Sequence, residues 1–193
     1  LAIVSGRSIC QLDAMLGAVA ADITLAGSHG AELRHNGQIV GLPRPAGLDA
    51  AGDEIRLYVD AHPGTIAELK SFGVALHYRL APLLEADAQT TAIAIAARHG
   101  LAVQPGKMMI ELHTPGTDKG DAVDALLAMP PMEGSIPIMI GDDLTDEPAL
   151  AAAALHGGFG ILVGPERDTA ALYGLADVAD VRHWLGLLVE AGA

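Results

Sequence analysis

The chain has 193 residues, of which 51% are hydrophobic, and it carries a formal net charge of −13 at pH 7. A chain of this size can bury a substantial core, in one domain or in two small ones. This net negative charge repels nucleic acid and anionic membrane surfaces, so we expect neither as a partner. A phosphate ligand would need a local cation to offset the negative charge.

Two further features bear on the cellular compartment. No apolar stretch reaches the roughly 18 residues that span a bilayer, and no signal-peptide pattern opens the chain. The single cysteine, Cys10, cannot form an internal disulfide, which fits a reducing compartment. We therefore expect a cytoplasmic protein with Cys10 half-buried in the first helix. The sequence does not determine the oligomeric state.

The first thirty residues follow the rhythm of a parallel sheet. A strand (1–4), a helix (8–20) and a second strand (23–26) succeed one another, joined by short loops. The first strand has no methionine, cap or helix before it, so we expect further residues of the same domain upstream of Leu1.

The pattern changes in the middle of the chain. Asn36-Gly37 is a strong hairpin signal between two short strands. A broken helical stretch (65–72), a strand (74–80), a helix (88–99) and a strand (107–113) follow. Hairpins, alternating strands and segregated helices are typical of an antiparallel α+β module.

The parallel rhythm resumes after Pro115 and Gly116. We expect a helix (118–129), a strand (136–140), a helix ending at 155, a strand (161–163) and a last helix (181–190). The predicted fold is therefore α/β, with a Rossmann-like parallel core formed by residues 1–30 and 116–193. Residues 31–115 form an inserted antiparallel α+β cap.

The segment from Gly141 to Glu147 has four carboxylates in six residues, directly behind an apolar strand. In parallel α/β sheets, ligands bind at the carboxyl ends of the strands. Mg²⁺ suits this setting, because it uses one or two protein carboxylates and is often completed by a substrate phosphate. We predict Asp142 and Asp143 as its ligands. The acids at positions 146 and 147 are also explained as ordinary acids of a helix N-terminus.

Two more polar residues lie at predicted element ends. Ser5 ends the first strand, where it is either a phosphate-binding residue or a simple capping or turn serine. Lys119 lies in the first turn of a helix, where the macrodipole disfavours a cation. It either offsets carboxylates and donates to a phosphate oxygen, or is a solvated surface lysine.

In the cap, strand alternation places Arg79, His77, Lys107 and Glu111 on one open polar face. Such a face is either ordinary solvated surface or a site for a polyhydroxylated ligand, which needs both donors and acceptors.

Several motifs together carry a family resemblance. They are Leu1-Ala-Ile-Val-Ser-Gly-Arg-Ser8, Gly27-Ser-His-Gly-Ala-Glu32, Leu76-His-Tyr-Arg79, Lys107 with Glu111, Gly116-Thr-Asp-Lys-Gly120 and Gly141-Asp-Asp-Leu-Thr-Asp-Glu147. In this order they resemble the trehalose-6-phosphate phosphatases, a branch of the haloacid dehalogenase superfamily.

The resemblance implies a role for each matched residue. Ser5 would bind the transferring phosphoryl group, Lys119 would steady phosphate and nucleophile, Asp142 would ligate Mg²⁺, and Asp146 would support it. The residues that would bind the sugar phosphate substrate are Arg7, His29, Glu32, Arg79, Lys107 and Glu111.

The family's nucleophile loop, Asp-x-Asp-Gly-Thr, does not occur in these residues. We expect it upstream of Leu1, and we expect the 193 residues alone to be inactive. The leading hypothesis is Mg²⁺-dependent hydrolysis of trehalose 6-phosphate through an aspartyl-phosphate. The alternatives are another sugar phosphatase of the superfamily, or a catalytically silent module that binds a sugar phosphate.

Overall fold

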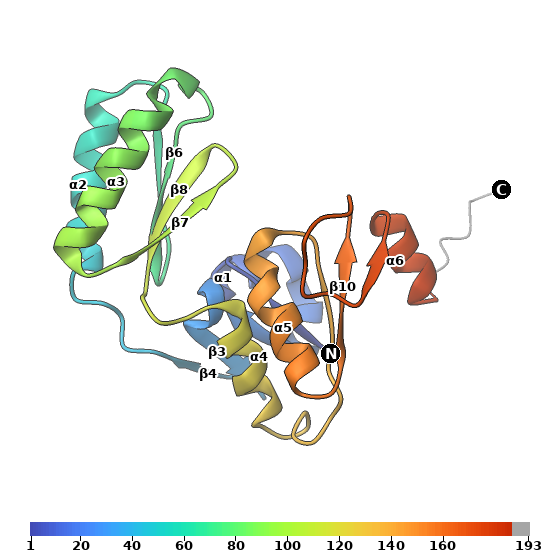
Figure 1. Ribbon diagram of the computed structural model, residues 1–193. Helices are drawn as coiled ribbons and strands as arrows, with labels where there is room; N and C mark the ends of the chain where they lie inside the picture. The colour runs from blue at the N-terminus through green and yellow to red at the C-terminus, as the bar shows by residue number, and fades with distance from the viewer. Residues whose placement is uncertain (187–193) are drawn as a thin grey trace. The chain divides into compact units, whose positions relative to one another are not determined.

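The computed structural model describes residues 1–186 and divides the chain into two compact units, Leu1–Thr117 and Asp118–Ala193 (Figure 1). Each unit is described by itself. Among residues 1–186, no helix combines the length and the apolar character needed to cross a bilayer.

The first sheet of unit 1 has the strand order β1-β2-β3-β4. Its elements are β1 (Ala2–Val4), α1 (Ile9–Leu16), β2 (Thr24–Gly27), β3 (Glu32–His35) and β4 (Gln38–Gly41). Strands β1 and β2 are parallel and the hairpin β3–β4 is antiparallel, as predicted. The hairpin turns at Asn36 and Gly37, whose φ angles of 49° and 75° match a type I′ turn.

Helix α1 begins at a reciprocal capping box between Ser8 and Gln11, and it packs Ile9 and Leu12 against β2. Cys10 is exposed, not half-buried as expected, because the inner face of the helix is taken by its neighbours. The predicted helix stops at Leu16, where the chain tightens into a 3₁₀ turn over Gly17–Asp22.

The second sheet of unit 1 is antiparallel, with the order β5-β6-β8-β7. Two helices cover one face, as Figure 1 shows in cyan and green. The elements are α2 (Leu48–Ala61), β5 (Ile66–Leu69), β6 (Gly73–His77), α3 (Glu85–His99), β7 (Ala102–Gly106) and β8 (Met109–His113). The covered face contributes Val74, Leu76, Ile110 and Leu112 to the core, so the alternating pattern of β6 and β8 is confirmed.

The structure differs from the prediction at three elements of this module. Residues 66–69 form a strand that pairs with β6, and not a broken helix, because cross-strand pairing satisfies the backbone of this short segment. Helix α2 and strand β7 were not predicted. Yet Leu48, Ala51, Ile55 and Tyr58 recur on the helical period and are all buried.

The hairpin β3–β4 hydrogen-bonds to β2 and extends the first sheet. Sequence position 31 therefore does not coincide with a break between the sheets. The division into residues 1–30, 31–115 and 116–193 stays a prediction.

Unit 2 has a parallel sheet of order β11-β10-β9. Its elements are α4 (Lys119–Leu127), β9 (Ile138–Gly141), α5 (Glu147–Leu155), β10 (Phe159–Val163), β11 (Tyr173–Leu175) and α6 (Val178–Trp184). Helices α4 and α5 pack through Val123, Ala149 and Ala152. The parallel rhythm is confirmed, whereas β11 was missed. The last helix begins earlier than expected, and residues 187–190 of its predicted range lie outside the described residues.

Candidate active site

The acidic segment follows the carboxyl end of β9, as predicted, and is organised by a buried aspartate. Asp146 is 5% exposed. Its Oδ2 accepts hydrogen bonds from the backbone amides of Asp142 and Asp143, both at 3.0 Å. A Cβ on Gly141 would lie 2.6 Å from Asp146 Cβ, so only glycine fits there. We call residues 141–146 the acid loop, and Asp146 holds it in shape.

Lys119 binds the opposite oxygen of the same carboxylate. Its Nζ lies 2.5 Å from Asp146 Oδ1 and 3.0 Å from Thr145 Oγ1. The side chain of Lys119 is 11% exposed, which disagrees with a solvated surface lysine. Asp118 caps α4 and places Lys119 in its first turn, where the helix dipole is unfavourable. The Asp146 carboxylate offsets that cost.

Asp142 and Asp143 are exposed. Asp143 Oδ1 accepts from the Leu144 amide at 2.7 Å and so caps the 3₁₀ turn Leu144–Asp146. Within residues 1–186, no three His, Cys, Asp or Glu side chains are grouped to hold a metal by themselves. Mg²⁺ needs no such cage, because it keeps several waters and takes one or two carboxylates. The carboxylate oxygens of these two residues fit such an ion.

A second cation, not predicted from the sequence, lies beside the acid loop. Arg167 forms an ion pair with Glu147 and donates from Nη2 to the carbonyl oxygen of Asp143 at 3.1 Å. Burial opposes the ionisation of Glu147, but hydrogen bonds from Ala170, Arg167 and Thr169 outweigh it and lower its pKa. Arg167 lies in a loop with no recognisable motif. Its place in the site is known only from its contacts with Glu147 and Asp143 in the folded chain.

In unit 1, the loop after β1 is bonded to the loop after β2. The Ser5 carbonyl oxygen accepts a hydrogen bond from the His29 amide at 3.0 Å, and the Arg7 carbonyl oxygen accepts one from the Ser28 amide at 2.9 Å. The Oγ atom of Ser5 accepts from the Arg7 amide at 3.1 Å, while α1 is capped by Ser8. Ser5 Oγ therefore bonds within its own turn, and Ser5 is not the helix cap; its predicted phosphate-binding role stays a prediction. Arg7 itself is exposed.

Glu32 and His29 support this loop pair. Glu32 Oε1 accepts from the Ile9 amide at 3.0 Å and from Ser28 Oγ at 2.6 Å, so this carboxylate holds the start of α1. His29 has a left-handed backbone (φ 57°), and its ring would lie 2.6 Å from a Cβ on Gly6. The substrate-binding roles of both residues stay predictions.

The polar face of the cap is not one open surface. Glu111 is 5% exposed, and its Oε2 lies 2.5 Å from Lys70 Nζ and 4.0 Å from His29 Nε2. Arg79 and Lys107 are exposed, and Arg79 donates to the Lys107 carbonyl at 3.4 Å. The expectation that Arg79, Lys107 and Glu111 share one open face is wrong. Lys107 lies in the turn before β8, whereas Glu111 lies within β8, opposite Ala75, and is buried.

His113 is a further member of this buried polar cluster. His113 contacts the His29 ring at a centroid distance of 5.3 Å, and burial lowers its pKa. The fourth side chain of the predicted face, His77, pairs with Glu68 at 2.8 Å and is half-buried.

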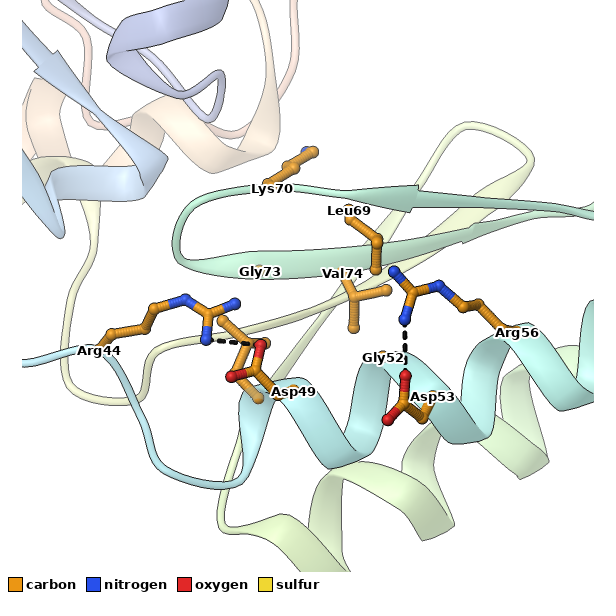
Figure 2. Close-up of a pocket in the computed structure, with 10 residues that line it drawn as sticks. Arg44, Asp49, Gly52, Asp53, Arg56, Leu69, Lys70, Gly73 and Val74 are labelled. Atoms are coloured by element: carbon orange, nitrogen blue, oxygen red, sulfur yellow. Dashed lines mark hydrogen bonds and ion pairs between the residues drawn. The ribbon is translucent and has the colours of Figure 1, made fainter.

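A cavity of about 270 Å³ opens elsewhere in unit 1, between α2 and the β5–β6 turn (Figure 2). Two ion pairs lie at its rim, Arg44 with Asp49 and Arg56 with Asp53. None of the predicted site residues lines it. Its lining includes Lys70, the partner of Glu111, so the cavity adjoins the buried polar cluster around Glu111.

Comparison with known proteins gives a consistent result. The family model "Trehalose-phosphatase" matches residues 1–178. The chain is 38% identical to the trehalose-6-phosphate phosphatase of Escherichia coli K12, over 99% of this chain and 72% of that protein. It is 36% identical to a probable trehalose-phosphate phosphatase of Sinorhizobium fredii, over 86% of this chain and 63% of that protein. It spans 51% of the length of the mycobacterial relatives it matches.

A solved structure agrees with this match. The crystal structure of a trehalose-6-phosphate phosphatase related protein superposes with a TM-score of 0.82 at 30% identity, and covers 96% of this chain and 79% of that one. The Candida albicans trehalose-6-phosphate phosphatase C-terminal domain has the same fold, with a TM-score of 0.74 at 23% identity, over 96% of this chain and 76% of that one. The α/β fold and the resemblance are thereby confirmed. This chain belongs to the trehalose-phosphatase family.

Proposed function

We propose that this chain carries the substrate-binding and metal-binding parts of a Mg²⁺-dependent trehalose-6-phosphate phosphatase. One observation carries the proposal beyond the family match. The exposed Asp142 carboxylate lies on a loop that the buried Lys119–Asp146 pair holds in place. Exposed acids on a preorganised loop at a strand end are suited to bind a cation without rearranging.

The proposed reaction is a two-step phosphoryl transfer. An aspartate of an Asp-x-Asp-Gly-Thr loop, which these 193 residues do not contain, would attack phosphorus while the bond from phosphorus to the sugar oxygen breaks. The second aspartate of that loop would give the leaving sugar oxygen its proton and later take a proton from the attacking water. Water then attacks the aspartyl-phosphate and releases phosphate. Lys119 donates a hydrogen bond to a phosphoryl oxygen, and Ser5 donates from Oγ to another.

Asp142 would hold Mg²⁺, with Asp143 as the second candidate ligand. When bound, the ion would neutralise negative charge on the phosphoryl oxygens. Asp146 supports the ligands through the backbone amides that it binds.

The cap residues would select the sugar. Arg79, Lys107 and Glu111 offer donors and an acceptor for hydroxyl groups, with Arg7, His29 and Glu32 near the cap entry. Glu111 is already paired with Lys70, so the carboxylate is oriented before a ligand arrives. We place the reaction in the cytoplasm, where the single cysteine would stay reduced.

The proposal is tested with a longer polypeptide in which an Asp-x-Asp-Gly-Thr loop precedes Leu1. Phosphate release is measured with trehalose 6-phosphate and a panel of other sugar phosphates, with and without Mg²⁺. A replacement of the nucleophilic aspartate by asparagine is the control. Equal turnover across the panel favours a general sugar phosphatase, and binding without turnover favours a silent sugar-phosphate module.

A further inference from the structure

One arginine fastens the loop after β10 to the acid loop. The Arg167 guanidinium donates from Nη1 to the Glu147 carboxylate and to the Asp168 carbonyl, and from Nη2 to the carbonyl of Asp143 at 3.1 Å. It thus contacts the backbone of a candidate metal ligand without contacting that residue's carboxylate.

Glu147 extends the connection along the same loop. Its Oε2 accepts from the Ala170 amide at 2.8 Å and from Thr169 Oγ1 at 3.1 Å. The side chains of Glu147 and Arg167 are each 24% exposed, so water competes with these bonds only partly. The two side chains therefore link the first turn of α5, the loop at 167–170 and the acid loop.

We infer that Arg167 and Glu147 form a clamp that positions the Asp142–Asp143 segment for a divalent cation. These are positioning residues, since neither ligates the ion. The inference rests on the proposed function for the identity of the ion. The planar guanidinium is suited to this task because its fixed fork of donors satisfies a carboxylate and a carbonyl together, which a lysine ammonium cannot do in one geometry.

The charges of the segment are consistent with such a clamp. It contains four carboxylates, at positions 142, 143, 146 and 147. Lys119 offsets Asp146 and Arg167 offsets Glu147. Two negative charges remain, on the two exposed aspartates, which is the complement of one divalent cation.

The clamp and simple electrostatics predict opposite effects of removing Arg167. Methionine at this position removes one positive charge beside the ion, which by charge alone would tighten Mg²⁺ binding. Loss of the bond to the Asp143 carbonyl would instead loosen the ligands and weaken binding. The sign of the change in affinity therefore separates the two explanations.

The experiment measures Mg²⁺ affinity by calorimetric titration, and backbone amide exchange at residues 142–144 by hydrogen–deuterium exchange. We expect Arg167→Met to weaken Mg²⁺ binding by about tenfold, as for loss of a partner that orients a metal ligand. We also expect faster exchange of these amides and partial recovery in Arg167→Lys. Unchanged or tighter binding together with unchanged exchange would overturn the clamp.

A matched control exists in unit 1. Arg34 also joins a carboxylate and a backbone carbonyl, with bonds of 2.6 Å to Asp13 and 2.8 Å to the Ala20 oxygen. Arg34→Met should leave Mg²⁺ affinity and exchange at residues 142–144 unchanged. Equal effects of both variants would show a general loss of stability and would contradict the clamp.

Failure of the proposed function gives a different result. If the wild-type chain binds no Mg²⁺, or if Asp142→Asn binds it as well as wild type, the proposed ligand set is wrong. In that case amide exchange at residues 142–144 still tests the clamp. Faster exchange in Arg167→Met supports the clamp, and unchanged exchange overturns it.

Discussion

Lys119 has two tasks at the scale of a single residue. Its ammonium is available for a phosphoryl oxygen in the proposed reaction, and it also neutralises the buried Asp146 that shapes the acid loop. The sequence predicts that Lys119 offsets carboxylates and donates to phosphate, but a lysine in the first turn of a helix gives no sign of which carboxylate lies beside it. Burial and pairing appear only when β9 and α4 are placed together.

Lys119→Met should therefore cost stability as well as activity. Removing one partner of a buried ion pair costs about 3–5 kcal/mol, because the other charge stays buried without compensation. We expect Lys119→Met to lower the free energy of unfolding, and Asp146→Asn to recover part of the loss in the double variant. Denaturant titrations of the three variants measure both effects. A wild-type midpoint for Lys119→Met would show that the pair contributes nothing.

His113 gives a pH dependence that can be assigned to one residue. Burial lowers its pKa below the ordinary histidine value of 6.5, so the folded chain binds this proton less readily than the unfolded chain. The stability contribution of the neutral ring is complete above pH 6.5 and is lost as the pH falls from that value through the lower pKa of the folded chain. Wild type should thus lose more stability between pH 7.5 and 5.5 than His113→Gln. Parallel losses in the two proteins would contradict the assignment.

At the scale of elements, the acid loop depends on a close approach between the end of β9 and Asp146. A Cβ on Gly141 would meet Asp146 Cβ at 2.6 Å and Cγ at 2.8 Å, whereas at Gly174 in β11 the nearest atom lies 3.8 Å away. The two glycines lie in strands of one sheet, and only the first has no room for a side chain. They form a matched pair for substitution.

Gly141→Ala should destabilise unit 2 by about 1–3 kcal/mol, the usual cost of overpacking, and should weaken Mg²⁺ binding because Asp146 must move. Gly174→Ala should change stability by less than about 0.5 kcal/mol. Thermal unfolding and Mg²⁺ titration of both variants provide the measurement. Similar losses in the two variants would argue against a tight contact at the acid loop.

The elements differ in how far the sequence predicts them. Parallel strands and the helices that follow them could be predicted because apolar runs, capping residues and the Asn36-Gly37 turn are local signals. Helix α2 carries such a local signal as well, in the helical period of its buried residues, and was missed. Strand β5 could not be placed in the same way, since Ile66–Leu69 is too short to show a period and is defined by its pairing with β6. The same limit applies to the site: Asp142 follows from a motif, whereas Arg167 and Lys70 are found only through contacts distant in sequence.

At the scale of the whole molecule, the specificity of the proposed reaction rests on the cap. Glu111→Gln keeps the size of the side chain but removes the charge opposite Lys70, so a sugar hydroxyl loses its charged acceptor. A site built for hydroxyls loses affinity only for ligands that present them. In the longer polypeptide, the ratio of kcat/KM for trehalose 6-phosphate over a small aryl phosphate should fall. A lid without sugar contacts would leave that ratio unchanged.

Hydrolysis of trehalose 6-phosphate is tested most directly by comparing two polypeptides, the 193 residues alone and the longer form with an Asp-x-Asp-Gly-Thr loop before Leu1. Phosphate release is followed with and without Mg²⁺. We expect no release from the 193 residues, because Lys119 and a metal ion do not replace a covalent nucleophile. We expect Mg²⁺-dependent release from the longer form, with trehalose 6-phosphate preferred over other sugar phosphates. Release by the 193 residues, or a longer form that binds trehalose 6-phosphate without hydrolysing it, would contradict the proposed function.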